Sequence, residues 1–479
     1  MNLQELLSGW PIEQAVPDLN VNDIAVDSRE VTQGSLFFAL KGVNSDGLDF
    51  VGEAVAKGAI AIVTDHEVLS QTCPVIYVKD ARLSLAKVAA RFYKDQPDVI
   101  AAVTGTSGKT SVASFLRQIW AHSGVSAASV GTLGVNSPSG LQYGSLTTPD
   151  PIKVHKILKD LFIEGVTHVA MEASSHGIDQ HRLDGVKLSA AAFTNLGRDH
   201  LDYHKTIENY FTAKMHLFDD LLPRDRPAII FSDDNYSQVA IDHVQKAGRE
   251  VLTVGKKGSF IQLKSVQKEL RRQLLVLESH GTQYDISLPL VGDFQVANAL
   301  VAAGLAMVTG VEETNAMLSL EQLVGPPGRL QLIGYKNGDA VIYVDYAHKP
   351  EALRNVLSSV RPFTKNRIIV VFGCGGDRDK GKRPLMGAIA NELADIVIVT
   401  DDNPRFEDAA RIRREVLAAV PKALEFGDRR QAIEYAISSL QSGDTLIVAG
   451  KGHETGQIIG DKIYHFSDQE EILRALGEP

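Results

Sequence analysis

The stretch Val99–Ser111, VIAAVTGTSGKTS, joins an apolar run to a glycine-flanked turn that carries a lysine and hydroxyl side chains. The β-branched run over 99–103 predicts a buried parallel strand, and helical apolar spacing predicts a helix over 112–122. The turn therefore lies at a helix N-terminus, where unpaired N–H groups and the helix dipole favour a phosphate. Lys109 can reach the terminal phosphates and Thr110 can offer a hydroxyl to Mg²⁺. The stretch predicts a nucleotide-phosphate site.

This loop departs from the general pattern G-x-x-x-x-G-K-[ST], because Val103 stands at the first glycine position and the loop begins at Gly105. A bare G-K-T tripeptide also occurs in ordinary turns. The preceding strand and the following helix favour the phosphate-binding interpretation.

Length and composition limit the possible class of protein. At ~150 residues per domain, 479 residues suggest about three domains, and 44% hydrophobic with 23% charged residues is typical of a globular protein. Neither a run of 18 apolar residues nor a secretory N-terminal pattern occurs, so we expect a cytoplasmic protein without a membrane span. The net charge of −10 argues against a broad nucleic-acid surface. Cys73 and Cys374 lack metal-ligand spacing.

The order of strand and helix patterns predicts an α/β fold of three domains. We expect a small N-terminal α/β domain over residues 1–90, a central P-loop domain with a doubly wound, mostly parallel sheet over 91–326, and a C-terminal Rossmann-like α/β domain over 327–479. Alternating residues over 260–288 favour antiparallel strands, and the paired prolines at 326–327 mark the second boundary.

Polar clusters follow several of the predicted strands. They lie at 172–176, 195–204, 345–348, 373–381, 401–405 and 450–454. Ligands of parallel α/β sheets gather at the carboxyl ends of the strands, so these clusters are candidate binding loops.

Four motifs together resemble the Mur ligases, ATP-dependent amino-acid ligases of bacterial cell-wall synthesis. They are GTSGKT at 105–110, DSR at 27–29, TTP at 147–149 and DNPR at 402–405. The resemblance covers essentially the whole chain, and the shortened phosphate loop is the form that the family uses. It implies a UDP-substrate domain, an ATPase domain and an amino-acid domain, in that order.

Within the family, the motifs resemble the type that adds the third amino acid to UDP-N-acetylmuramoyl-L-alanyl-D-glutamate. The D-N-P-R form implies meso-2,6-diaminopimelate as that amino acid. The implied reaction is phosphorylation of the glutamate γ-carboxylate by ATP, then attack of the amine on the acyl phosphate, with formation of ADP and phosphate. Lys109 and Mg²⁺ would screen the two anions.

The resemblance also implies the catalytic and metal-contacting residues. Lys109, Glu172, His200 and Lys214 would be catalytic, and Thr110, Glu172, His200 and Lys214 would contact Mg²⁺. Lys214 would be carried as a carbamate, N6-carboxylysine, whose formation needs the neutral amine and so is favoured by burial. By residue type alone, His200 is also an ordinary histidine and Lys214 an ordinary solvated helix lysine.

The remaining implied residues fall into three ligand groups. ATP would contact Gly105, Thr106, Ser107, Gly108, Lys109, Thr110, Ser111, Asn298, Arg329, Asp345 and His348. UDP-N-acetylmuramoyl-dipeptide would contact Val26, Ser28, Val43, Asn44, Ser45, Thr147, Thr148, Ser174, Gln180 and Arg182. Diaminopimelate would contact Arg378, Asp402, Asn403, Pro404, Arg405, Gly450 and Glu454.

Arg405 is the expected selectivity residue. Diaminopimelate differs from lysine by a second carboxylate on the far carbon, which a guanidinium holds through two charged hydrogen bonds. Lysine would leave the arginine unpaired, and an unfilled buried charge gives strong discrimination. Glu454 suits the distal ammonium. By itself, the DNPR motif also occurs as an ordinary turn.

Other functions remain open from the sequence. One is a related ligase that adds L-lysine or D-alanyl-D-alanine, or a folylpolyglutamate synthase. Another is a binding protein that hydrolyses ATP without ligation. A kinase is disfavoured because it needs no amino-acid pocket. We expect a monomer whose partners are small molecules, namely the nucleotide-sugar dipeptide, diaminopimelate and ATP, with no nucleic acid.

Overall fold

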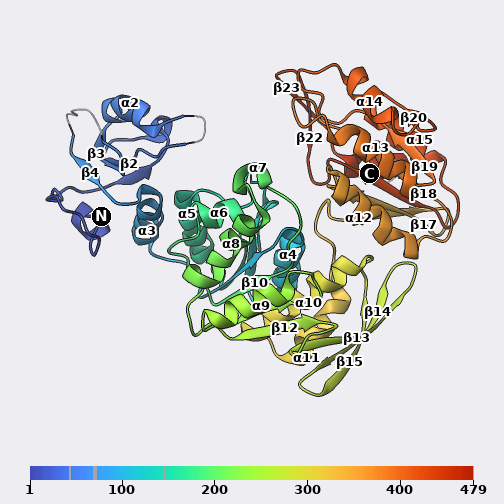
Figure 1. Cartoon of the computed structure of the whole chain (residues 1–479), viewed down its shortest axis with the longest axis horizontal. Helices are drawn as coiled ribbons and strands as arrows, with labels where there is room; N and C mark the ends of the chain where they lie inside the picture. The colour runs from blue at the N-terminus through green and yellow to red at the C-terminus, as the bar shows by residue number, and fades with distance from the viewer. Residues whose placement is uncertain (43–44, 68–72, 145, 478–479) are drawn as a thin grey trace. The chain divides into compact units, whose positions relative to one another are not determined.

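The computed structural model describes residues 1–42, 45–67, 73–144 and 146–477. The chain divides into two compact units, Met1–Val254 with Gly304–Glu312, and Gly255–Ala303 with Glu313–Pro479. Figure 1 shows the elements in chain order. The expected domain boundaries near residues 90 and 326 stay a prediction.

The first unit begins with a small parallel sheet in the order β1-β2-β3-β4. Its elements are α1 (Leu3–Leu6), β1 (Asp23–Ala25), β2 (Ser35–Phe38), α2 (Val51–Ala56), β3 (Ala59–Thr64), β4 (Val75–Tyr77) and α3 (Ala81–Tyr93). All four residues of β2 are buried, which agrees with the continuous apolar run of a strand covered on both faces.

The first unit continues with a larger sheet, ordered β12-β11-β10-β5-β9-β6-β7-β8 within this unit. Its first six strands are parallel, and β7 and β8 extend it as antiparallel strands. The elements are β5 (Val99–Thr104), α4 (Lys109–His122), β6 (Ala127–Gly131), β7 (Gly134–Ser137), β8 (Gly140–Gln142), α5 (Pro151–Ile163), β9 (His168–Glu172), α6 (Ser175–Asp179), β10 (Ala190–Phe193), α7 (Leu201–His204), α8 (Ile207–His216), a π-helical turn (Leu217–Leu221), β11 (Ala228–Phe231), α9 (Ser237–Lys246) and β12 (Val251–Gly255).

The strand order places a topological switch point at β5. The chain leaves β5 toward β6 and β9 on one side and later returns to β10 on the other. Ligands bind at such points, outside the carboxyl ends of the strands. The predicted phosphate loop follows β5, so the fold puts it at the expected place.

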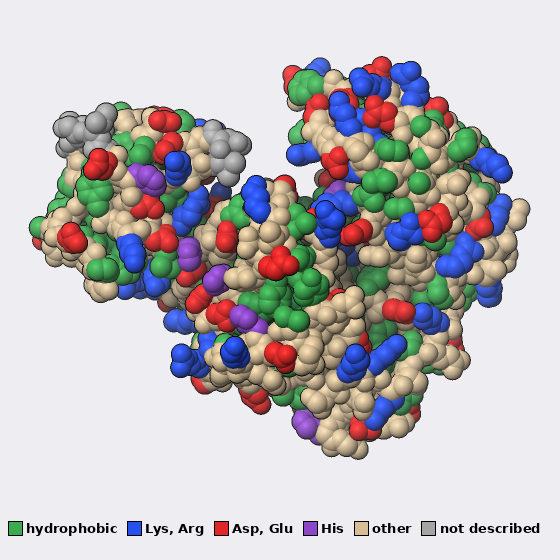
Figure 2. Space-filling model, viewed as in Figure 1, with side chains coloured by type: hydrophobic (Ala, Val, Ile, Leu, Met, Phe, Trp, Pro, Cys, Tyr) green, Lys and Arg blue, Asp and Glu red, His purple; other side chains and the backbone are tan. Residues whose placement is uncertain are grey.

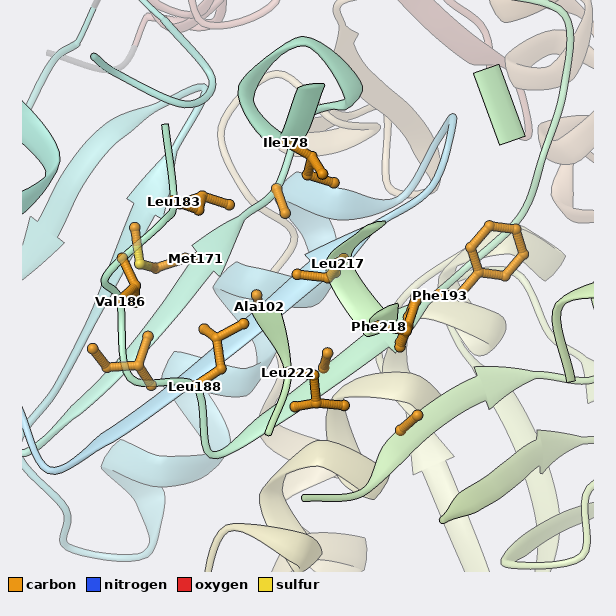
Figure 3. Close-up of a cluster of buried hydrophobic side chains, with 14 of the residues drawn as sticks. Ala102, Met171, Ile178, Leu183, Val186, Leu188, Phe193, Leu217, Phe218 and Leu222 are labelled. Atoms are coloured by element: carbon orange, nitrogen blue, oxygen red, sulfur yellow. The ribbon is translucent and has the colours of Figure 1, made fainter. Parts of the chain in front are cut away.

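Apolar side chains from strands and connections form the core beside this sheet (Figure 3). Met171 of β9 and Phe193 of β10 are buried there with Leu217 and Phe218 of the π-helical turn. Helix α4 is anchored by its apolar face, and the indole of its Trp120 donates a 3.0 Å hydrogen bond to the hydroxyl of Thr309. These contacts fix α4 against the sheet, and with it the loop that precedes the helix.

The second unit contains the strands expected to be antiparallel. Strands β13 (Ile261–Lys268), β14 (Gln273–Ser279) and β15 (Thr282–Leu288) pair antiparallel, as the alternation over 260–288 predicted. They are followed by α10 (Asp293–Val308), which crosses the unit boundary at residue 304, and by α11 (Glu313–Ser319).

The C-terminal sheet has the order β16-β17-β21-β18-β19-β20, in which only β16 is antiparallel to its neighbour. Its elements are β16 (Gln331–Lys336), β17 (Ala340–Asp345), α12 (Pro350–Val360), β18 (Ile368–Phe372), α13 (Lys382–Leu393), β19 (Ile396–Val399), α14 (Ala409–Leu417), β20 (Leu424–Glu425), α15 (Arg429–Ser438), β21 (Thr445–Ala449) and α16 (Asp468–Leu476), with the separate hairpin β22 (Gly456–Ile459) and β23 (Lys462–His465). The predicted α/β class is confirmed, since helices alternate with the strands of three larger sheets in the described part of the chain, beside the two-stranded hairpin.

Acidic and basic side chains are interspersed on the face of the molecule shown in Figure 2. Within the described ranges, no helix combines the length and apolar character that crossing a membrane requires.

Candidate active site

The loop predicted to bind phosphate joins β5 to α4, in the strand–turn–helix order that the sequence predicted. Gly105 and Gly108 have φ angles of +147° and +92°, which side-chain-bearing residues rarely adopt, and Gly108 is the N-cap of α4. The ammonium of Lys109 donates to the carbonyls of Gly105 and Thr106, at 2.8 and 3.0 Å. The loop therefore places its lysine over its own backbone at a helix N-terminus, where an anion is favoured.

The loop is fastened to the segment that follows β10. Asn195 accepts from the backbone N–H of Ser107 at 2.9 Å, and its own carbonyl accepts from Thr106 N–H at 2.9 Å. The hydroxyl of Thr194 donates to Ser107 O at 2.7 Å, and the N–H of Gly197 donates to the hydroxyl of Thr106 at 2.9 Å. This network sets the loop's shape from the adjacent parallel strand.

Glu172 is the polar centre beside the loop. It ends β9 in register with Val103 and is 3% exposed. Its carboxylate accepts from the hydroxyl of Thr110 at 3.0 Å and from the backbone N–H of Thr132 at 2.7 Å. The structure thus brings together two of the predicted metal-contacting residues, Thr110 and Glu172, and both offer the oxygen donors that suit Mg²⁺.

Lys214, on α8, is buried against the same loop. It is 1% exposed, and its nitrogen donates to Gly105 O at 2.8 Å, the carbonyl that also accepts from Lys109. Burial first, and then the neighbouring charge of Lys109, lower the pKa of Lys214 well below its usual range. The ring of Tyr210 lies 4.3 Å from the nitrogen. The environment favours the neutral amine.

His200 is held in a left-handed conformation, φ +54°, as the N-cap of α7. Its ring lies against His176 with centroids 4.8 Å apart, and His176 in turn lies 4.2 Å from the ring of Tyr203. Within the described ranges, no cluster of three or more His, Cys, Asp or Glu side chains has the geometry of a metal site. The predicted metal set therefore stays a prediction.

Residues predicted for the nucleotide-sugar peptide lie around a pocket of about 190 Å³ in the first unit. Val26, Gln180 and Arg182 line it, together with Arg82 and Leu146, which the sequence reasoning did not assign. The guanidinium of Arg182 donates to Thr148 O at 2.7 Å and to Gln180 at 2.8 Å. Burial lowers the pKa of Arg182.

The other residues of this predicted group occupy nearby loops. Thr147 and Thr148 precede α5, and the hydroxyl of Thr148 donates to Glu172 O at 2.8 Å. Ser174 caps α6 through Gly177 N–H at 3.0 Å. Ser28 donates to Glu53 at 2.8 Å in a short 3-10 turn. Ser45 is exposed, and Val43 and Asn44 lie outside the described residues.

In the second unit, Asp345 ends β17 as a buried acceptor. Its carboxylate accepts from the N–H groups of Leu330 and Ala347 at 2.6 and 2.8 Å. Burial raises the pKa of Asp345 to about 6, against the opposing charge of Arg329. The guanidinium of Arg329 lies 4.9 Å from the ring centre of Tyr346.

Two further predicted nucleotide residues belong to this unit. Asn298, on α10, is 4% exposed and donates to Gln295 at 3.4 Å. His348 follows β17, its Nδ1–H donates to Tyr346 O at 2.9 Å, and its pKa is lowered by burial. Gln295 donates to Arg329 O at 3.3 Å, so α10 and the segment before β16 are joined.

Several of the residues predicted to bind diaminopimelate lie close together on the loops after β19 and β21. Asn403 donates to Glu454 at 3.1 Å. Arg405 has a φ of +52°, its N–H donates to Ile458 O at 3.0 Å, and its guanidinium donates to Gly376 O at 2.9 Å. Asp402 and Pro404 are buried beside them, Gly450 follows β21 directly, and Arg378 is exposed on the loop after β18.

Similarity to known proteins extends along nearly the whole chain. Three family models match: Mur ligase family, catalytic domain, over residues 20–93, Mur ligase middle domain over 103–306, and Mur ligase, glutamate ligase domain, over 328–452. A UDP-N-acetylmuramoyl-L-alanyl-D-glutamate–2,6-diaminopimelate ligase of Agrobacterium fabrum is 59% identical over 460 residues, 96% of this chain and 94% of that protein. The chain belongs to the Mur ligase family.

A second relative and two solved structures are also similar to this chain. A ligase of the same name from Brucella melitensis is 59% identical over 461 residues, 96% of this chain and 94% of that protein. A solved structure of such a ligase has a TM-score of 0.75 at 32% identity and covers 100% of this chain and 99% of that one. The Mur ligase MurF of Thermotoga maritima, solved with ADP, has a TM-score of 0.64 at 20% identity over 96% and 98% of the chains, which shows a shared fold.

Sequence reasoning missed several residues of these Mur ligase loops. Thr132 and Asn195 shape the phosphate side through hydrogen bonds to Glu172 and to the loop. Lys451 and His453 lie between Gly450 and Glu454, which were predicted to bind the amino acid. Lys451 is buried and His453 is half-buried. Their place in the block GKGHE directly after a predicted strand was the available signal.

Proposed function

We propose that the chain is an ATP-dependent, ADP-forming ligase that joins meso-2,6-diaminopimelate to UDP-N-acetylmuramoyl-L-alanyl-D-glutamate in peptidoglycan synthesis. The observation that carries this proposal is identity of 59% to ligases of that name over 96% of the chain. The meeting of Asn403, Arg405 and Glu454 on adjoining loops supports the choice of amino acid.

The first step is activation of the glutamate γ-carboxylate. ATP transfers its terminal phosphoryl group to this carboxylate, which gives an acyl phosphate and ADP. The N–H groups at the start of α4 hold phosphate oxygens, and Lys109 moves from its loop carbonyls to the terminal phosphate. The Arg182 guanidinium, in the 190 Å³ pocket, pairs with an anionic group of the nucleotide-sugar peptide.

Mg²⁺ fits the donors that lie beside this loop. Thr110 and Glu172 would hold it, with His200 and a carbamate on Lys214 as the further contacts that the family resemblance implies. When bound, it neutralises charge on the phosphate oxygens. The neutral amine of Lys214, favoured by burial, is the form that reacts with CO₂ to give the carbamate.

The second step is attack of the amino acid on the acyl phosphate, with loss of phosphate. Arg405 holds the distal carboxylate of diaminopimelate, and Glu454 accepts from the distal ammonium. Asp345, Asn298 and Arg329 serve the nucleotide. We place the reaction in the cytoplasm, with a monomeric enzyme, as the sequence predicts.

Substrate-dependent release of ADP tests the proposal. With UDP-N-acetylmuramoyl-dipeptide, ATP and Mg²⁺ present, ADP should form in proportion to added diaminopimelate, and the nucleotide product should gain the mass of one diaminopimelate residue. ADP formation that is independent of the nucleotide-sugar peptide would instead identify a slow ATP-hydrolysing binding protein.

A further inference from the structure

Lys451 is a fully buried cation in the amino-acid loop. It follows β21, and its side chain is 0% exposed. Its ammonium donates to the side-chain oxygen of Asn403 at 3.0 Å and to Gly456 O at 2.7 Å, and it lies 3.4 Å from the carboxylate of Asp402. A lysine is almost never buried to this degree unless it is paired, so these contacts hold it there.

The contacts of Lys451 determine which way the Asn403 amide points. Its oxygen accepts from Lys451 and from the backbone N–H of Ile458, at 2.9 Å. Both are obligatory donors, so the oxygen of the amide must face them. The amide nitrogen therefore faces Glu454, to which it donates at 3.1 Å. One carboxylate oxygen of Glu454, Oε2, is fixed in this way.

Lys451 also balances two acids. It lies 3.4 Å from Asp402 and 3.9 Å from Glu454. Without its charge, the buried carboxylate of Asp402 and the partly exposed carboxylate of Glu454 would repel one another, which favours the protonated form of one of them. A protonated Glu454 is a poor acceptor for a substrate ammonium.

We propose that Lys451 is a positioning residue for the amino-acid substrate: it keeps Asn403 and the Glu454 carboxylate in the arrangement that accepts the distal ammonium of a diamino diacid. This inference rests on the proposed function, which places that ammonium at Glu454. Lys451 itself does not touch the substrate.

The charges around Glu454 agree with this role. Burial, and then the charge of Asp402, raise the pKa of Glu454, while Lys451 and Arg405 oppose that rise. Tyr346 and Arg429, which forms a buried ion pair with Asp468, are further ionisable groups that interact electrostatically with Glu454. Removal of Lys451 therefore moves the pKa of Glu454 further upward.

The test compares two substrates that differ only in the distal amine. Meso-diaminopimelate has it, and 2-aminopimelate keeps the distal carboxylate without it. In Lys451→Met, KM for diaminopimelate should rise about tenfold, because the Asn403 amide loses a donor that orients it and Glu454 loses a neighbouring positive charge. KM for ATP and for the nucleotide-sugar peptide should stay within about twofold, and so should KM for 2-aminopimelate. Because loss of Lys451 raises the pKa of Glu454, the increase in KM for diaminopimelate should become smaller as pH is raised.

A second pair of variants covers the case in which Lys451→Met does not fold. Asp402→Asn with Lys451→Met removes one negative and one positive charge together, and is compared with Asp402→Asn alone. The preference for diaminopimelate over 2-aminopimelate should again be lost, since Asn403 loses the same donor. Lys462→Met, an exposed lysine on β23, is the matched control and should keep the preference.

Equal losses for both amino acids, or an unchanged KM for diaminopimelate, overturn the inference. The wild-type enzyme separates this result from a failure of the proposed function. If the wild type does not release ADP in response to diaminopimelate, the proposed function fails. If the wild type ligates and the variants keep its preference, only the role of Lys451 fails.

Discussion

Arg405 shows how one residue is prepared for one substrate group. Its left-handed φ of +52° and its backbone hydrogen bond to Ile458 set the direction in which the side chain leaves the loop. The Nη1 of the guanidinium donates to Gly376 O at 2.9 Å and to Asn403 O at 3.5 Å, and the remaining N–H groups suit a carboxylate. The residue therefore matches the distal end of diaminopimelate.

Arg405→Ala should lower kcat/KM for diaminopimelate roughly 30-fold, because a charged hydrogen-bonded pair is lost. This factor corresponds to about 2 kcal/mol of transition-state binding free energy. The KM for ATP should not change, and the preference over L-lysine should fall. Steady-state kinetics with both amino acids measures this. Arg411→Ala, at an exposed position on α14, is the control. An undiminished preference for diaminopimelate in the Arg405 variant would contradict the assignment.

Lys214 is the second residue whose environment determines its chemistry. Lys214→Ala should reduce ligation on the order of 100-fold, since the carbamate's charge at the metal is lost, and added formate or acetate should restore part of the rate. The readout is ADP release with and without the added acid. Lys246→Ala, exposed on α9, should behave as wild type. Full activity of the Lys214 variant without any added acid would rule out the role.

Two glycines with positive φ flank helix α4, and they allow the effect of a clash in the loop to be separated from that of backbone strain. Gly105, before the helix, has φ +147°, and a Cβ there would collide with the Thr194 hydroxyl. Gly124, after it, has φ +77° and open space around a Cβ. The first position therefore combines backbone strain with a clash, and the second has strain alone.

Gly105→Ala should abolish measurable ATP binding because the phosphate loop must shift. Gly124→Ala should cost about 1 kcal/mol of unfolding free energy and leave ATP binding intact. Nucleotide titration and thermal unfolding of both variants provide the comparison. Equal ATP affinity in the two variants would show that the loop's shape is not what binds phosphate.

The loop after β21 should make stability depend on pH. Burial, and then the charge of Arg329, lower the pKa of His453 to about 4. The unfolded chain binds a proton near pH 6.5 and the folded chain does not, so this contribution to stability is present above that pH and is lost as pH falls toward 4.

His453→Gln should reduce the drop in thermal midpoint between pH 7.5 and pH 5. The difference from wild type isolates His453, because His348 and other histidines with lowered pKa values remain in both proteins. His465→Gln, on the exposed strand β23, is the control. Parallel curves for wild type and the His453 variant would disprove the linkage.

At the scale of the whole molecule, sequence patterns predicted the class and the positions of the strands well. Buried parallel strands are short apolar runs between turn signals, so the strand predicted over 99–103 agrees with β5 (Val99–Thr104) to within one residue. The loops that follow them were the right places to look for ligands.

The partners within those loops could not be predicted. Hydrogen bonds such as Thr132 to Glu172 join residues 40 positions apart, and Lys451 to Asn403 joins residues 48 positions apart. No local pattern encodes these pairings, because register and burial arise only when the sheet forms. The sequence suggested Glu172 and Asn403, and folding added Thr132 and Lys451.

A competition between two amino acids, read out by the mass of the product, shows which amino acid the enzyme joins to the nucleotide-sugar dipeptide. The enzyme is given ATP, Mg²⁺ and UDP-N-acetylmuramoyl-L-alanyl-D-glutamate with equal concentrations of meso-diaminopimelate and L-lysine. We expect one nucleotide product, heavier by a diaminopimelate residue, with one ADP for each molecule formed. A product that carries lysine in comparable amount, or ADP release without any ligated product, would contradict it.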